Sequence, residues 1–135
     1  MKNTILISIK KIYADKIISG EKIFEYRRVI PASKISGIAL YCTFPIQKIV
    51  AIVNVVANLT NHLDKLWEIT RFGGALSKSA FDSYFNGLII GHAYKLGKVK
   101  RLNSPLPLNA INKSLRYPPQ SFRYLDDKEF NILLQ

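Results

Sequence analysis

The chain has 135 residues, 48% of them hydrophobic, which fits one globular domain over residues 1–135 and excludes a disordered protein. Lys and Arg number 20 against nine acids, a formal net charge of +11 that favours a polyanionic partner, nucleic acid above all. The apolar runs are too short to span a bilayer, and the sequence has no polybasic block or basic amphipathic helix, so we expect a cytoplasmic protein with no membrane partner.

Apolar runs with strand character recur along the chain. Successive side chains on a strand face opposite sides, so Ile5, Ile7 and Ile9 should form the core face of the first strand. The fourth run is β-branched and apolar on both faces, which predicts a central strand of a barrel or covered sheet. Pro105 and Pro107 are expected to open a loop after the fifth run. The predicted strands cover residues 4–10, 22–30, 37–43, 48–58, 88–102 and 120–125.

Helical spacing appears between these runs. Gly20 should end the first helix, because glycine enters the left-handed region without strain. Asn61 and Ser77 are the expected N-caps of the second and third helices. The aromatic stripe of the third helix is interpreted as core and not as a base-stacking surface. The predicted helices cover 11–19, 62 to the glycine pair at 73–74, 78 to Gly87, and the tail 126–134.

Cysteine and histidine usage points to no metal chemistry. The single cysteine, Cys42, excludes an intrachain disulfide, and its place in a strand-like run predicts a buried residue. His62 and His92 lie far apart in sequence, and no Cys/His spacing is typical of zinc. We therefore predict neither a metal nor a cofactor.

Basic residues gather in the second half of the fifth strand. Lys95, Lys98, Lys100 and Arg101 are compatible with a solvated edge strand whose lysines oppose aggregation. They are equally compatible with a phosphate-facing surface. Both interpretations stay open at this point.

The stretch from Gly20 to Arg28 combines acids, bases and aromatics within nine residues. On a strand, Glu25 and Arg27 would share one face and Phe24 and Tyr26 the other, with Lys22 at the mouth of the preceding turn. Such charges often form only a solvated surface, where an ion pair contributes little. The alternative is a carboxylate flanked by cations in a functional site.

This stretch contains Gly20-x-Lys22-x-x-Glu25-x-Arg27, which matches the G-x-K-x-x-E-x-R signature of the ASCH family in the PUA-like superfamily. Further similarities occur in order along the chain, and together they resemble the small, stand-alone ASCH proteins of prokaryotes. They are Ser8-Ile9-Lys10, Tyr13-Ala14-Asp15-Lys16-Ile17, Phe81-x-x-Tyr84-Phe85-x-Gly87-x-x-x-Gly91-x-Ala93 and Pro118-Pro119-Gln120-Ser121-Phe122-x-Tyr124-Leu125.

The resemblance implies an α+β fold: a small, mostly antiparallel PUA-like β-barrel with helices packed around it. It also implies a basic cleft beside the signature strand that binds RNA or a nucleotide. Lys22, Arg27 and Arg28 would meet phosphates, and Glu25 would accept from a base edge or hold a neighbouring cation. Ser8, Lys10, Gln120 and Ser121 would make polar contacts at the rim.

Some ASCH-like proteins resemble enzymes, which gives a second hypothesis. The chain would then be a hydrolase, either a ribonuclease or an amidohydrolase of modified nucleosides, that uses Lys22 and Glu25. The amidohydrolase pattern places a threonine nucleophile three residues after its lysine, whereas this chain has Glu25 there. A Lys–Glu pair could instead activate water, provided that burial shifts either pKa.

Overall fold

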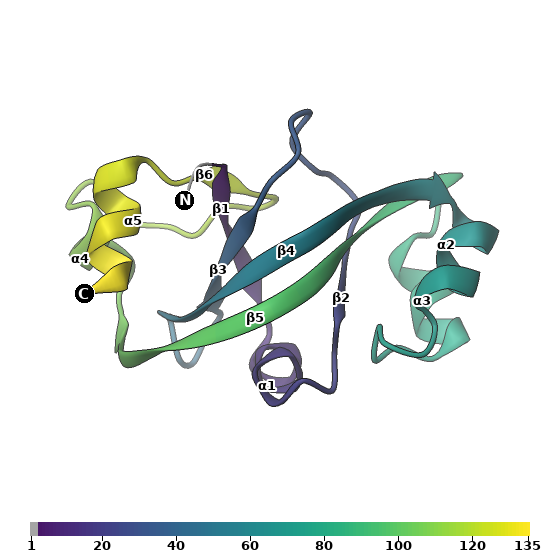
Figure 1. Ribbon diagram of the computed structural model, residues 1–135, viewed down its shortest axis with the longest axis horizontal. Helices are drawn as coiled ribbons and strands as arrows, with labels where there is room; N and C mark the ends of the chain where they lie inside the picture. The colour runs from purple at the N-terminus through teal and green to yellow at the C-terminus, as the bar shows by residue number, and fades with distance from the viewer. Residues whose placement is uncertain (1–2) are drawn as a thin grey trace.

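The computed structural model describes residues 3–135, and Figure 1 shows long central strands with α2 and α3 at one end and α4 and α5 at the other. Across these residues the chain forms six strands and five helices, which confirms the predicted α+β class. The strands are β1 (Thr4–Ile9), β2 (Phe24–Arg27), β3 (Gly37–Cys42), β4 (Lys48–His62), β5 (Ile90–Leu106) and β6 (Arg123–Tyr124). The helices are α1 (Lys11–Ser19), α2 (Leu63–Thr70), α3 (Lys78–Tyr84), α4 (Leu108–Ile111) and α5 (Asp127–Leu134).

The strands form one mixed sheet in the order β2-β5-β4-β3-β1-β6. β1 and β3 run parallel, and the other neighbouring pairs are antiparallel. The expectation of mostly antiparallel pairing is therefore correct. A closed barrel is not confirmed, because β2 and β6 stand at the two ends of the sheet and do not pair with each other in the described part of the chain.

Both faces of β1 are buried, although the alternating pattern predicted a core on one face only. Ile5, Ile7 and Ile9 join the cluster under α1, as predicted. Leu6, on the other face, is also fully buried and packs in a second cluster with Phe130 of α5. The C-terminal helix covers this second face, and its position depends on contacts that a local pattern does not contain.

β4 is central, as predicted, but β4 and β5 both extend beyond the predicted ends at residues 58 and 102. The register explains why Pro105 does not end β5. Ile49 pairs with Leu106 and Ala51 with Arg101, so the residues between Arg101 and Leu106 bulge out of the ladder. A proline in a bulge needs no ladder hydrogen bond.

The last predicted strand shrinks to the two residues of β6. Only Ile5 and Leu6 of β1 offer it partners, opposite Tyr124 and Arg123. The segment before it, residues 112–122, forms neither helix nor strand, and it links α4 to β6.

The helix boundaries follow most of the predicted caps. Gly20 adopts φ 85° at the end of α1, and the Ser77 side chain accepts a hydrogen bond from the Ala80 amide at the start of α3. Asn61 was a wrong cap: it remains in β4, and His62 occupies the N-cap of α2. The short helix α4, in a region predicted as loop, was not foreseen. No helix within residues 3–135 has both the length and the apolar surface to cross a membrane.

Candidate functional site

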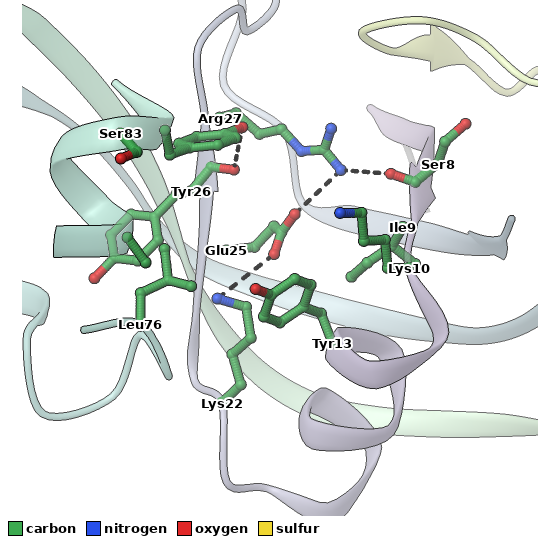
Figure 2. Close-up of a pocket in the computed structure, with 12 residues that line it drawn as sticks. Ser8, Ile9, Lys10, Tyr13, Lys22, Glu25, Tyr26, Arg27, Leu76 and Ser83 are labelled. Carbon is green, nitrogen blue, oxygen red and sulfur yellow. Dashed lines mark hydrogen bonds and ion pairs between the residues drawn. The ribbon is translucent and has the colours of Figure 1, made fainter. Parts of the chain in front are cut away.

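A pocket of about 490 Å³ lies between β1 and β2, with α1 and α3 at its sides (Figure 2). These two strands are far apart in the sheet order, yet the Arg27 guanidinium donates a hydrogen bond of 2.8 Å from Nη2 to the Ser8 carbonyl. The sheet therefore curls until β1 and β2 face each other, and the pocket occupies the gap that strand pairing leaves open. Its lining residues are Ser8, Ile9, Lys10, Tyr13, Lys22, Glu25, Tyr26, Arg27, Leu76, Ala80, Ser83 and Tyr84.

Lys22 is held by the turn after α1 and by a loop far along the chain. Its amide donates to the Lys16 carbonyl, and its ammonium donates a hydrogen bond of 2.6 Å to the Gly74 carbonyl. The side chain is only 3% exposed, between the rings of Tyr13 and Tyr26. Burial lowers the pKa of the Lys22 amine, and the Glu25 carboxylate opposes this effect only in part.

The same loop explains why β2 is shorter than the predicted strand over residues 22–30. The Gly73 carbonyl accepts hydrogen bonds from the amides of Ile23 and Phe24, so these amides bond to the loop, while the Ile23 carbonyl accepts from the Leu96 amide of β5. Gly74 lies so close to the Tyr26 hydroxyl that a Cβ there would clash with it. A side chain at Gly74 would therefore displace both the Tyr26 ring and the carbonyl that holds Lys22.

Glu25 lies between two cations, as the strand pattern predicted. Its Oε1 is 3.7 Å from the Lys22 ammonium, and its Oε2 is 3.1 Å from Arg27 Nη2. Arg27 Nε is the one buried side-chain nitrogen or oxygen within residues 3–135 that has no hydrogen-bond partner. An unpaired buried donor costs about 1–3 kcal/mol, so the fold keeps this guanidinium in place at some expense in stability.

Aromatic side chains that were assigned to helix cores complete the walls. Tyr13 lies one turn into α1, because the Lys10 carbonyl at the end of β1 accepts hydrogen bonds from the Tyr13 and Ala14 amides. Tyr84 of α3 donates from its hydroxyl to the Tyr26 carbonyl at 2.9 Å. Both are half-buried, with a ring on the apolar stripe and a hydroxyl at its edge. A tyrosine hydroxyl at the edge of an apolar helical stripe is the feature of the sequence that could have indicated Tyr13 and Tyr84 as pocket residues.

The predicted site residues divide into two groups. Lys10, Lys22, Glu25 and Arg27 line the pocket with their side chains, and Figure 2 shows Lys10 turned inward from the end of β1. Ser8 lines it through its carbonyl, since its hydroxyl points away and donates to the Pro119 carbonyl.

Three predicted residues do not line this pocket. Arg28 donates from Nη1 to the carbonyls of Tyr84 and Asn86, so it fastens the end of α3 to β2. Gln120 is exposed and Ser121 half-buried, in the segment that follows Pro119. Their contact with a ligand stays a prediction.

The lining carries three cations, Lys10, Lys22 and Arg27, against the single carboxylate of Glu25. The pocket therefore has a formal charge of +2 and favours an anion. No group of three or more His, Cys, Asp or Glu side chains arranged to hold a metal occurs in the described part of the chain.

Comparison with known proteins places the chain in a family. No protein-family model matches it. It is 30% identical over 135 residues to the ASCH domain-containing ribonuclease of Zymomonas mobilis, an alignment that covers 96% of this chain and 88% of that one. The chain belongs to the ASCH family. The crystal structure of ASCH from Zymomonas mobilis matches this ASCH fold with a TM-score of 0.89 at 27% identity, over 99% of this chain and 95% of that one.

A different match shows the same segment within a longer protein. ATP synthase subunit alpha of Ureaplasma parvum is 27% identical over 125 residues, which is 92% of this ASCH chain but 15% of that subunit. The chain thus spans about a seventh of that relative, and the similarity concerns one segment of it.

Proposed function

We propose that this protein binds RNA, with a phosphate and its adjoining nucleoside held in the pocket between β1 and β2. The observation that carries the proposal is the pocket's charge of three cations against one carboxylate. The ribonuclease of Zymomonas mobilis, similar over nearly the whole chain, supports RNA over other anions. The net charge of +11 agrees, because phosphate contacts dominate nucleic-acid affinity.

The three cations would have different tasks. Lys10 is exposed, and no described residue forms a hydrogen bond or an ion pair with its ammonium, so it is free to meet a phosphate. Lys22 uses one of its three N–H donors on Gly74, turns another toward Glu25 and keeps the third for an anion. Arg27 is committed to Glu25 and the Ser8 carbonyl, and it positions both strands. The half-buried Tyr13 ring offers a surface for the nucleoside base.

Titration of labelled single-stranded RNA at several salt concentrations tests this proposal. Lys10→Ala should weaken binding by about tenfold at low salt and reduce the salt dependence by about one phosphate contact. Lys34→Ala is the matched control, because Lys34 is also exposed and forms no hydrogen bond or ion pair with another described residue, but lies outside the pocket. Equal losses for both variants would refute the site, and failure of the native chain to bind RNA at low salt would refute the function.

Cleavage of the bound RNA is a second candidate, and the Lys22 amine favours it. Breaking a phosphodiester requires a proton to leave the attacking hydroxyl and another to reach the leaving oxygen. An amine whose pKa is lowered by burial exchanges protons nearer to neutral pH than an ordinary lysine. We assign to the Lys22 ammonium the proton that reaches the leaving oxygen, while solvent water takes the proton from the attacking hydroxyl. Glu25 positions that ammonium at 3.7 Å.

Cleavage and binding can be separated with three substitutions. Lys22→Met should lower the cleavage rate by about a hundredfold or more, because general acid–base catalysis contributes on that scale. Glu25→Gln should keep RNA affinity, or raise it by removing a negative charge, and still lose turnover. Lys10→Ala should raise KM and leave kcat nearly unchanged.

A gel assay of end-labelled RNA measures these rates, and circular dichroism checks that each variant folds. Cleavage by Lys22→Met at the native rate would exclude the assigned role. A native chain that binds RNA without cleaving it would leave RNA binding as the function of this pocket.

A further inference from the structure

A second pocket, of about 530 Å³, lies beside the end of β3, the turn that follows it, and α4. None of its lining residues belongs to the first pocket. They are Tyr41, Gln47, Pro107, Leu108, Asn109, Lys113, Leu115 and Arg116.

The polar ends of this second pocket have no partners. Gln47, Asn109, Lys113 and Arg116 are all exposed, and none of their side chains forms a hydrogen bond or an ion pair with another described residue. The lining contains two cations and no acid, so its formal charge is +2. Cations suit phosphate oxygens, whereas side-chain amides both donate to and accept from base edges. The combination fits a nucleotide better than it fits a simple anion.

The turn after β3 holds the Gln47 side chain in place with a strained backbone. Gln47 has φ 55°, in the left-handed region that costs a residue with a Cβ roughly 1–2 kcal/mol. Tyr41, which forms part of the wall, is 5% exposed and is therefore held rigidly by the core. The second pocket thus combines a fixed wall with unpaired polar groups.

The two pockets adjoin neighbouring strands of the sheet. Tyr41 in β3 is the parallel partner of Ser8 in β1, and adjacent strands lie about 4.8 Å apart. The segment from Arg116 to Pro119 connects the pockets, since Arg116 lines the second and the Pro119 carbonyl accepts the Ser8 hydroxyl beside the first. Between them Tyr117 is 79% exposed, as an aromatic on which a base can stack.

We propose that single-stranded RNA held in the first pocket continues across Tyr117 into the second pocket. There Lys113 and Arg116 bind a flanking phosphate, and Gln47 and Asn109 contact the base next to it. This inference rests on the proposed RNA binding, and it adds that the protein engages a strand of several nucleotides and not a single one. Affinity should therefore increase with RNA length until both pockets are filled.

Binding of a dinucleotide and of a longer single-stranded RNA to the full chain tests the inference. The double variant Lys113→Ala with Arg116→Ala should lose roughly tenfold affinity for the longer RNA, with a salt dependence lower by about two phosphate contacts. Its affinity for the dinucleotide should stay unchanged. Lys34→Ala with Lys65→Ala is the matched control, because both residues are exposed, lie outside both pockets and lie outside the basic run of β5.

Tyr117→Ala should also weaken binding of the longer RNA alone. Phe72→Ala should not, although Phe72 is aromatic and even more exposed, at 90%. Equal losses in the two double variants would indicate diffuse attraction and overturn the second pocket. If Lys10→Ala weakens RNA of both lengths while the Lys113/Arg116 variant weakens neither, the first pocket stands and the second falls. If the native chain binds neither RNA, both proposals fail together.

Discussion

Glu25 and Glu129 are both buried carboxylates, 7% and 2% exposed, and they lie in different parts of the molecule. Glu25 is in β2, near the α2 and α3 end, and Glu129 is in α5 at the other end (Figure 1). Glu129 receives two hydrogen bonds from Arg123, at 3.0 and 2.8 Å, one from Asn112 and one from the Asp126 amide. Glu25 has one close contact, at 3.1 Å to Arg27, and a looser one to Lys22.

This difference in hydrogen bonding distinguishes Glu129, which stabilises the fold, from Glu25, which lies in the candidate functional site. Both carboxylate oxygens of Glu129 accept hydrogen bonds, and Glu129 lines neither of the two pockets described above. Glu25 borders a cavity, its cationic neighbours keep free donors, and Arg27 Nε is unpaired. A saturated network has nothing left for a ligand, whereas an incomplete one beside a cavity does.

The largest expected effect is the loss of stability when Glu129 is replaced. Glu129→Gln should lower the free energy of unfolding by roughly 3–5 kcal/mol, because it leaves the Arg123 guanidinium without its carboxylate and puts an NH2 donor where a carboxylate oxygen accepts hydrogen bonds. Glu25→Gln should cost only about 1–2 kcal/mol, because Lys22 keeps its hydrogen bond to the Gly74 carbonyl and Arg27 keeps its bond to the Ser8 carbonyl.

Urea denaturation of both variants measures this contrast. Glu129→Ala serves as a second variant, since it removes the whole side chain and should be at least as destabilising. The distinction between the two carboxylates would be lost if Glu25→Gln proved as costly as Glu129→Gln.

The second effect is the response to acid. Burial alone would raise the pKa of Glu129, but hydrogen bonds from Arg123, the Asp126 amide and Asn112 hold it at about 2, below the ordinary 4.5. A carboxyl with a lowered folded pKa stabilises the fold above pH 4.5 and loses this contribution as the pH falls toward 2. The shift corresponds to roughly 3 kcal/mol.

Stability curves of the native chain and Glu129→Gln should therefore converge between pH 4.5 and 2. Glu25→Gln serves as the comparison in the same measurement. A constant gap between the native chain and Glu129→Gln over this range would argue against the assigned pKa.

The features that could be predicted from sequence are those set by neighbouring residues. Gly20 as the stop of α1, Ser77 as the cap of α3 and the helix begun by Asp126 all depend on contacts within one turn. The signature also placed Glu25 and Arg27 on one side of β2, because alternation along a strand is a local rule.

The features that could not be predicted depend on distant partners. The Lys22 ammonium is held by the Gly74 carbonyl, 52 residues away, and Arg28 donates to carbonyls at the end of α3, 56 and 58 residues away. Arg28 thus looked like a phosphate ligand in sequence and is a fastening between β2 and α3 in the fold. Tyr13 was assigned to a core stripe because its helical spacing places the residue on the apolar face of α1. The spacing does not indicate where the hydroxyl lies.

The smallest effect concerns Lys22 at alkaline pH, opposite to the acid range of Glu129. Burial lowers the pKa of Lys22 below its ordinary 10.5, so in the range just below pH 10.5 the unfolded chain holds more protons than the folded one. The contribution of Lys22 to the free energy of unfolding therefore rises with pH in that range. Lys22→Met has no titrating amine at this position. The stability of the native chain relative to this variant should therefore increase with pH.

Thermal unfolding of the native chain and Lys22→Met across that alkaline range gives the difference, with Lys34→Met as the exposed control. A difference that falls as pH rises would mean that Glu25 outweighs burial and raises the Lys22 pKa. The Lys22–Glu25 pair would then be a stabilising ion pair like Arg123–Glu129. Only the pocket beside Glu25 would still distinguish the two carboxylates. A rising difference instead means that Lys22 carries its charge at a cost, which is the state that an arriving phosphate would relieve.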